Sequence, residues 1–178
     1  MTTVRARERF RRLRRNYEGG ASRPLGGYLA ALTAFGAYVG LLTGVGAASG
    51  ARLPKRVSFG DVALVSLATH KLSRLFAKDA ITSPIRAPFT RYEEPAGAGE
   101  LNESVRGGGV RHALGELASC PFCLAVWSAT TFTAGLVIAP RATRLVTTTL
   151  SATAVSDALQ FVYDAAKHLP SRAETTEE

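Results

Sequence analysis

Two long uncharged segments constrain the fold of this chain more than any other feature of its sequence. Residues 24–51 form a run of 28 residues without a charged side chain, and residues 117–140 form a second run of 24. Each run exceeds the ~20 apolar residues that a helix needs to cross the hydrocarbon core of a bilayer. The sequence therefore predicts an integral membrane protein.

The hydrophobic pattern predicts an all-α fold, a polytopic membrane helix bundle of about four transmembrane helices. The second helix is the weakest, because only its middle lacks ionisable residues, and it either crosses the membrane or dips into it. A short amphipathic helix is expected to lie along the membrane interface before the third span. The expected spans cover residues 25–48, 59–76, 122–139 and 145–163, and the interfacial helix covers residues 110–117.

The charge distribution predicts three regions and an orientation. Residues 1–23 hold eight arginines against two glutamates, and we expect a basic cytoplasmic arm that contacts anionic lipids rather than nucleic acid. Residues 24–167 are expected to form a membrane domain with a cytoplasmic loop at 79–109, and residues 168–178 a polar disordered tail. In this topology 15 Lys and Arg residues lie on the side of the termini and five on the other side. The positive-inside rule then predicts a multi-pass protein of the cytoplasmic membrane with both termini in the cytoplasm.

Glycine repeats every four residues within the first expected helix, at Gly36, Gly40 and Gly44. This spacing places three positions without side chains on one helix face, where two membrane helices can approach closely. We expect this stripe to pack within the chain, between copies of it as a homo-oligomer, or against another membrane protein.

The expected loop at 79–109 is rich in proline and glycine and shows little periodicity. Its first half is expected to be ordered coil and its second half to be solvated. Arg86, Arg91, Arg106 and Arg111 can surround an anion such as a phospholipid headgroup or phosphate, and the alternative is a solvated basic loop. No Walker or dinucleotide pattern is present, which argues against nucleotide binding.

The motif Cys120-Pro121-Phe122-Cys123 opens the second uncharged run, and it has three interpretations. Its spacing is that of redox dithiols, so Cys120 and Cys123 are candidate catalytic residues. His112 and Glu116 precede them at helical spacing, and all four side chains together can hold zinc or iron. In the third interpretation the cysteines pack as small apolar side chains and no cofactor is bound.

Ionisable residues within the expected spans form another candidate cluster. Asp157 lies near the middle of the fourth span, where a carboxylate is costly without a partner, and Lys71 or Arg74 is expected to pair with it. Together with Asp61 and His70, Asp157 either relays protons or ions, or belongs to a buried ion pair that fixes how the helices pack.

Several short segments resemble a known family. They are Lys71-Leu72-Ser73-Arg74-Leu75, Lys78-Asp79-Ala80-Ile81-Thr82, Arg86-Ala87-Pro88-Phe89, Arg111-His112, and the two-cysteine motif with Trp127. Over roughly residues 57–165 the chain resembles the bacterial family catalogued as domain of unknown function 1360. The resemblance implies a small multi-pass bacterial membrane protein, related to some encoded by spore-forming bacteria, and it carries no catalytic assignment.

Taken together, these patterns favour a non-enzymatic interaction or structural component of a membrane. One alternative is a thiol-redox or metal centre at the two cysteines. The other is a small transporter or channel subunit that uses Asp61 and Asp157. No motif specifies a substrate.

Overall fold

The computed structural model describes residues 5, 8–9, 11–13, 16–17 and 23–174. The expected arm over residues 1–23 falls largely outside this part, as do residues 175–178 of the expected tail. The elements are α2 (Leu25–Ala48), α3 (Phe59–Lys78), η1 (Ala80–Thr82), α4 (Ser83–Arg86), β1 (Thr90–Gly97), β2 (Glu100–Val105), α5 (Gly109–Ser119), α6 (Pro121–Ile138) and α7 (Pro140–Glu174).

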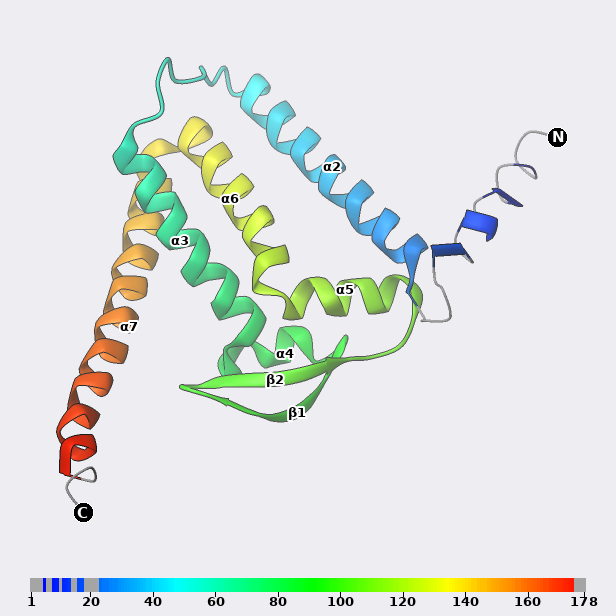
Figure 1. Cartoon of the computed structure of the whole chain (residues 1–178). Helices are drawn as coiled ribbons and strands as arrows, with labels where there is room; N and C mark the ends of the chain where they lie inside the picture. Colours follow the sequence, from blue (N-terminus) through cyan, green and yellow to red (C-terminus); the bar gives the residue numbers. More distant parts are fainter. Residues whose placement is uncertain (1–4, 6–7, 10, 14–15, 18–22, 175–178) are drawn as a thin grey trace.

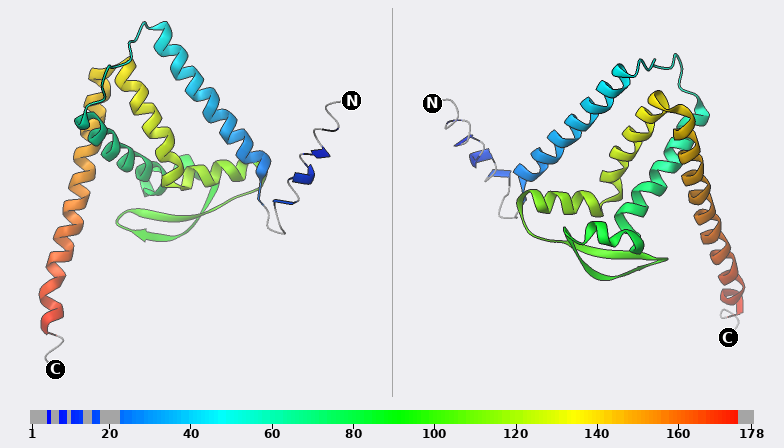
Figure 2. Two further views of the ribbon diagram at one scale, coloured as in Figure 1. Left: turned by 45° about the horizontal axis from the view of Figure 1, so that its top comes forward. Right: turned by 180° about the vertical axis from the view of Figure 1, so that it is seen from behind.

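The short elements gather at one end of the long helices. Figure 1 shows α4, α5 and the β1–β2 hairpin at this end, which we call the hairpin end, and the linker at 49–58 with the α6–α7 turn at the opposite end. The last turns of α7 extend past the hairpin in both views of Figure 2. Since α7 ends at Glu174, the helix continues into the expected tail of residues 168–178.

Capping residues determine where two of the long helices begin. The hydroxyl of Ser58 accepts a hydrogen bond from the Asp61 N–H at 3.0 Å and donates one to the Asp61 carboxylate at 2.9 Å. At α6 the Cys120 sulfur accepts from the Cys123 N–H at 3.2 Å, and Pro121 occupies the first turn. Both arrangements satisfy backbone donors that a helix start leaves unpaired.

The segment at 79–109 is largely regular structure and not the expected coil. Its second part is an antiparallel hairpin, in which Gly97 pairs with Glu100 across the turn. Gly97, Ala98 and Gly99 have positive φ values of 86°, 45° and 79°, which lets the chain reverse within two residues. Two register shifts interrupt the strands and hide their alternating pattern. The all-α prediction is therefore wrong, because the fold contains a two-stranded sheet.

Small side chains line the contact between α3 and α7. Ala68 on α3 is buried, and so are Thr147 and Ser151 on α7. The hydroxyl of Ser151 donates to the Leu64 carbonyl of α3 at 2.9 Å. This contact joins the two helices by a hydrogen bond as well as by close packing, which small residues permit.

The prediction of four membrane spans is wrong. In the part of the chain that the structure describes, two helices are long and apolar enough to cross a membrane, namely α2 and α6. Charged residues in the second half of α3 make this helix less apolar, and the many Thr and Ser residues of α7, with Asp157 and Gln160, lower the mean hydropathy of α7. A helix of sufficient length is therefore present at each expected position, but two of the four are too polar.

The apolar surfaces of α2 and α6 are hardly covered by protein. The most apolar 18-residue stretch of α2 is 0% buried and that of α6 is 11% buried. The side chains of Leu32, Leu41 and Phe122 are 67%, 64% and 86% exposed. The buried apolar residues of the described part are few and mostly small: Ala68, Ala77, Ala113 and Phe132. Proteins that work in water rarely expose apolar surface of this extent. The two helices thus indicate association with a membrane.

Candidate functional site

The hairpin end contains a fully satisfied buried ion pair. Arg86 and Glu103 have side chains that are 1% and 5% exposed, and Arg86 donates from Nε and Nη2 to the two carboxylate oxygens at 2.7 and 3.1 Å. The remaining N–H groups donate to the Phe76 carbonyl at 2.9 Å, the Thr82 hydroxyl at 2.7 Å and the Asp79 carbonyl at 3.0 Å. All five donors of the guanidinium are used, so none is left for the anion that the sequence suggested.

Further contacts attach the hairpin tip to the end of α3. Arg74 donates from Nε and Nη2 to Glu100 at distances of 2.5 to 3.0 Å. The backbone N–H of Ala80 donates to the Gly99 carbonyl at 2.8 Å, and Asp79 forms a β-bridge with Glu100. The tip is thereby held beside the last turns of α3.

Two ion pairs connect α3 with α7. Lys71 Nζ donates to Asp157 at 2.6 Å, so Asp157 has one of the two partners that the sequence indicated. Near the opposite end, Arg144 donates to both oxygens of Asp61 at 3.0 and 3.1 Å. Hydrogen bonds from Arg144, and then from Ser58, hold the pKa of Asp61 below its usual value.

The residues suggested for a relay are not brought together as one cluster. Asp61 and Lys71 are ten positions apart on α3, which corresponds to about 15 Å along the helix axis. The structure therefore shows two separate pairs, each of which fixes the position of α7 against α3. Relay of protons or ions stays a prediction.

Free thiols of Cys120 and Cys123 lie at the α5–α6 corner, where Cys123 is exposed. His112 Nε2 lies 3.4 Å from Glu116 Oε1, and Arg23 Nη1 lies 3.3 Å from the same oxygen. Within the described residues, no group of three or more His, Cys, Asp and Glu side chains converges as a metal site requires. The structure thus gives Glu116 protein partners, and the thiol and metal interpretations stay predictions.

The other arginines suggested for an anion site lie apart from Arg86. Arg111 donates from Nε and Nη2 to the Pro88 carbonyl at 3.0 and 2.5 Å, which attaches α5 to the segment before β1. Arg91 is exposed on β1, and Arg106 reaches the Ala87 carbonyl at 3.4 Å. These residues mainly brace the chain, and anion binding at them stays a prediction.

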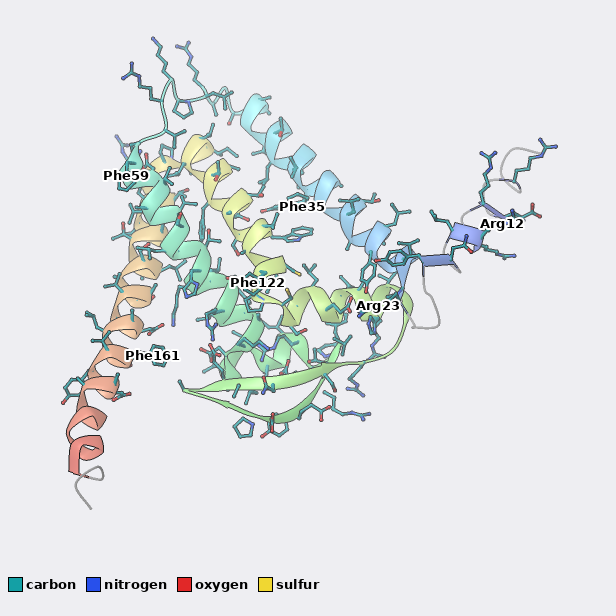
Figure 3. All side chains as sticks on the ribbon, in the orientation of Figure 1. Arg12, Arg23, Phe35, Phe59, Phe122 and Phe161 are labelled. Atoms are coloured by element: carbon teal, nitrogen blue, oxygen red, sulfur yellow. The ribbon has the colours of Figure 1, made fainter. Side chains whose placement is uncertain are left out.

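The helix α2 has one packed face and one free face. Phe35 and Tyr38 contact the Trp127 ring of α6 at centroid distances of 5.0 and 5.4 Å, and Figure 3 shows Phe35 between the two helices. Close to the hairpin end, a Cβ on Gly27 would lie 2.5 Å from the Gly109 carbonyl oxygen, so glycine is needed where α2 meets α5. At the stripe of Gly36, Gly40 and Gly44, an added Cβ would meet nothing within 4 Å.

Sequence reasoning missed Glu100 and Glu103 as partners of Arg74 and Arg86. We interpreted the glutamates of this segment as solvated. A signal was present, because acidic residues flank Gly97-Ala98-Gly99 on both sides, which is compatible with a tight turn between two polar strands. The buried arginine nearby needed an acidic partner.

Comparison with known proteins identifies the relatives of this chain. The model of the family described as "Protein of unknown function (DUF1360)" matches residues 64–163, which confirms the expected resemblance. A protein named "Sporulation protein YjcA" from Bacillus subtilis (strain 168) is 39% identical over 71 residues, 38% of this chain and 60% of that protein. The chain therefore spans about three fifths of the length of this curated relative. No solved structure matches.

Proposed function

We propose that this chain, which belongs to the DUF1360 family, is a non-enzymatic interaction component of the bacterial cytoplasmic membrane. In this proposal α2 and α6 are embedded in the bilayer, and α2 pairs with the α2 of a second copy. The observation that carries it is the uncovered apolar surface of these helices, whose most apolar 18-residue stretches are 0% and 11% buried. Lipid or another protein must cover such a surface.

The charge pattern supports one orientation of the embedded helices. Both α2 and α6 begin at the hairpin end, and residues 1–23 with their eight arginines directly precede α2. Basic segments beside a membrane helix stay in the cytoplasm and attract anionic lipids by ~1 kcal/mol for each charge near the surface. We therefore assign the hairpin end to the cytoplasmic side.

The free glycine face supports self-association. Gly36, Gly40 and Gly44 lie on one side of α2, with open space where side chains would be. The aromatic contacts of Phe35 and Tyr38 occupy a different side. Two identical stripes can meet about a two-fold axis with their backbones close together, as small residues permit in membranes.

Exchange of Gly40 for leucine tests this pairing. The oligomeric state of the purified full chain in detergent is measured by analytical ultracentrifugation over a range of protein-to-detergent ratios. We expect Gly40→Leu to weaken the dimer by about 5- to 150-fold, because an overpacked contact costs roughly 1–3 kcal/mol. Ala34 is exposed and lies about 120° from Gly40 around the axis of α2, outside the glycine stripe. Ala34→Leu is therefore the control that adds a leucine to another face of the same helix. A wild-type monomer, or equal weakening by both substitutions, would refute the pairing.

A further inference from the structure

A cavity of about 700 Å³ lies where α3, α7 and the hairpin tip meet. This volume is within the range of small-molecule sites, roughly 300–1,000 Å³. In Figure 3 the labelled Phe161 projects from α7 on the side of the hairpin tip, and it is one of the lining residues. The residues that carry the chemistry of the cavity are His70, Lys71, Arg74, Asp157, Phe161 and Asp164.

The two helical walls of the cavity carry opposite charge. From α3 come basic side chains, His70, Lys71 and Arg74, whose spacing places them on neighbouring positions of one helix face. From α7 come Asp157 and Asp164, seven positions apart and thus on one face, with Phe161 and the amide of Gln160 between them. The cavity is therefore polarised from a basic to an acidic wall.

The ion pair that joins these walls retains binding capacity. Lys71 and Asp157 side chains are 23% and 43% exposed, so both remain accessible from the cavity. An ammonium has three donors, and Lys71 uses one of them for Asp157. Among the described side chains, the partner of Asp164 is Lys167 at 3.8 Å, beyond hydrogen-bonding distance. In the described part of the chain, His70 makes no side-chain hydrogen bond or ion pair.

On the hairpin side the carboxylates already have partners. Asp79 accepts a hydrogen bond from the Ile81 N–H at 3.0 Å, and Glu100 accepts from Arg74 at 2.5 to 3.0 Å. Glu100 occupies Nε and Nη2 of Arg74 and offsets part of its charge, so Arg74 offers the cavity the two donors of Nη1, beside Lys71 and His70. The carboxylate oxygens that can still accept hydrogen bonds from a ligand therefore belong to Asp157 and Asp164 on α7.

We propose that this cavity binds a small zwitterion with a phosphate group and an ammonium group, the chemistry of phosphoethanolamine. The phosphate lies against Lys71 and Arg74, because cationic donors form short charge-assisted hydrogen bonds with phosphate, and His70 lies beside it. The ammonium lies against Asp157 and Asp164, next to the ring of Phe161, which attracts cations.

The position of the cavity allows two sources for such a ligand. Its α3 residues belong to the second half of that helix, which runs toward the hairpin end, and α6 begins at the same end. If α6 is embedded as proposed above, this end lies at the membrane interface. The ligand is then either the headgroup of an aminophospholipid or a soluble phosphoethanolamine ester, and binding of the soluble form does not depend on membrane insertion.

Calorimetry on the purified full chain in a non-ionic detergent tests the ligand chemistry. The probes are glycerophosphoethanolamine, which carries both charges, glycerol 3-phosphate, which lacks the ammonium, and ethanolamine, which lacks the phosphate. We expect the zwitterion to bind at least about tenfold more tightly than either half, a difference of ~1.4 kcal/mol. Equal affinity for the zwitterion and one of its halves, or no binding of the zwitterion, would overturn the proposal.

Two variants assign the binding to the cavity. Asp164 is 67% exposed, so Asp164→Asn leaves the fold intact and is expected to remove most of the preference for the zwitterion while glycerol 3-phosphate binding is unchanged. The double substitution Lys71→Asp, Asp157→Lys keeps the ion pair but reverses the walls, and is expected to weaken zwitterion binding about tenfold. Glu94→Gln, on the hairpin but outside the cavity, is the control with the same loss of charge. If Asp164→Asn binds the zwitterion like the Glu94→Gln control, the site is not this cavity.

Lipid nanodiscs distinguish the two sources. If the ligand is a lipid, native mass spectrometry retains phosphatidylethanolamine on the wild type and releases it from the Lys71→Asp, Asp157→Lys variant. If the ligand is soluble, glycerophosphoethanolamine binds the chain in phosphatidylglycerol nanodiscs as it does in detergent. Failure of both results overturns the zwitterion site and leaves the pairing of α2 to be judged by the Gly40→Leu experiment.

Discussion

Removal of the Glu103 carboxylate leaves a buried arginine without its counter-charge. The side chains of Arg86 and Glu103 are 1% and 5% exposed, so water cannot replace the lost partner. In Glu103→Ala two of the five donors of Arg86 lose their acceptor, and the charge stays enclosed. Breaking a buried pair by removing one partner costs about 3–5 kcal/mol. We expect a loss of stability of this size.

The assay is equilibrium unfolding of the purified protein in mixed micelles, combined with hydrogen exchange of the hairpin amides. Because Glu103 lies on β2 and Arg86 lies on α4, faster exchange is expected in β1 and β2 before global unfolding. The control is Glu94→Ala on the same hairpin, whose hydrogen bond to Asn102 is exposed and 3.3 Å long, with an expected change within about 0.5 kcal/mol. A Glu103→Ala cost below about 1 kcal/mol would refute the reasoning.

Two further predictions concern helix packing and pH. Gly27→Ala is expected to lower the free energy of unfolding by about 1–3 kcal/mol, measured by thermal unfolding, because its Cβ would lie 2.5 Å from the Gly109 oxygen. The control Gly26→Ala, whose Cβ would meet nothing within 4 Å, should not destabilise the fold. Equal effects of the two substitutions would contradict the close approach of α2 and α5. Arg144 and Ser58 hold the pKa of Asp61 below its usual 3.8, so the ionised carboxylate stabilises the fold above this pH, and the contribution is lost as the pH falls through the lowered pKa. Asp61→Asn should flatten the acid limb of a stability-against-pH curve, and an unchanged limb would show that the pair contributes nothing.

The sequence predicted helix positions well but not which helices are apolar enough to cross a membrane. The expected first span, residues 25–48, coincides with α2, since an unbroken apolar run leaves few alternatives. The same reasoning failed at α7, where Thr and Ser residues satisfy a helical pattern but lower its mean hydropathy. Polar residues can lie on a helix without making it a membrane span, and the pattern alone does not separate the two cases.

Contacts between distant residues were partly predictable. The cost of an isolated carboxylate among apolar residues predicted that Asp157 pairs with Lys71 or Arg74, and the structure shows Lys71 as the partner. The pairing of Arg86 with Glu103 was not predicted, because register shifts hide the strands of the hairpin and a glutamate beside glycines is typical of a solvated loop. The glycine face of α2 was expected from its spacing, but the spacing left open whether it packs within the chain, and only the structure shows that no other part of the described chain fills it.

The depth of Trp127 in a bilayer tests the central claim, membrane insertion of α6, most directly. Trp127 is the sole tryptophan of the chain and lies six residues after the start of α6, about 9 Å along the helix axis. Its fluorescence is measured in liposomes whose lipids carry bromine at different acyl positions. The account predicts quenching, strongest for bromines in the upper part of the acyl chains. Absence of quenching at every position, with emission as in water, would contradict it.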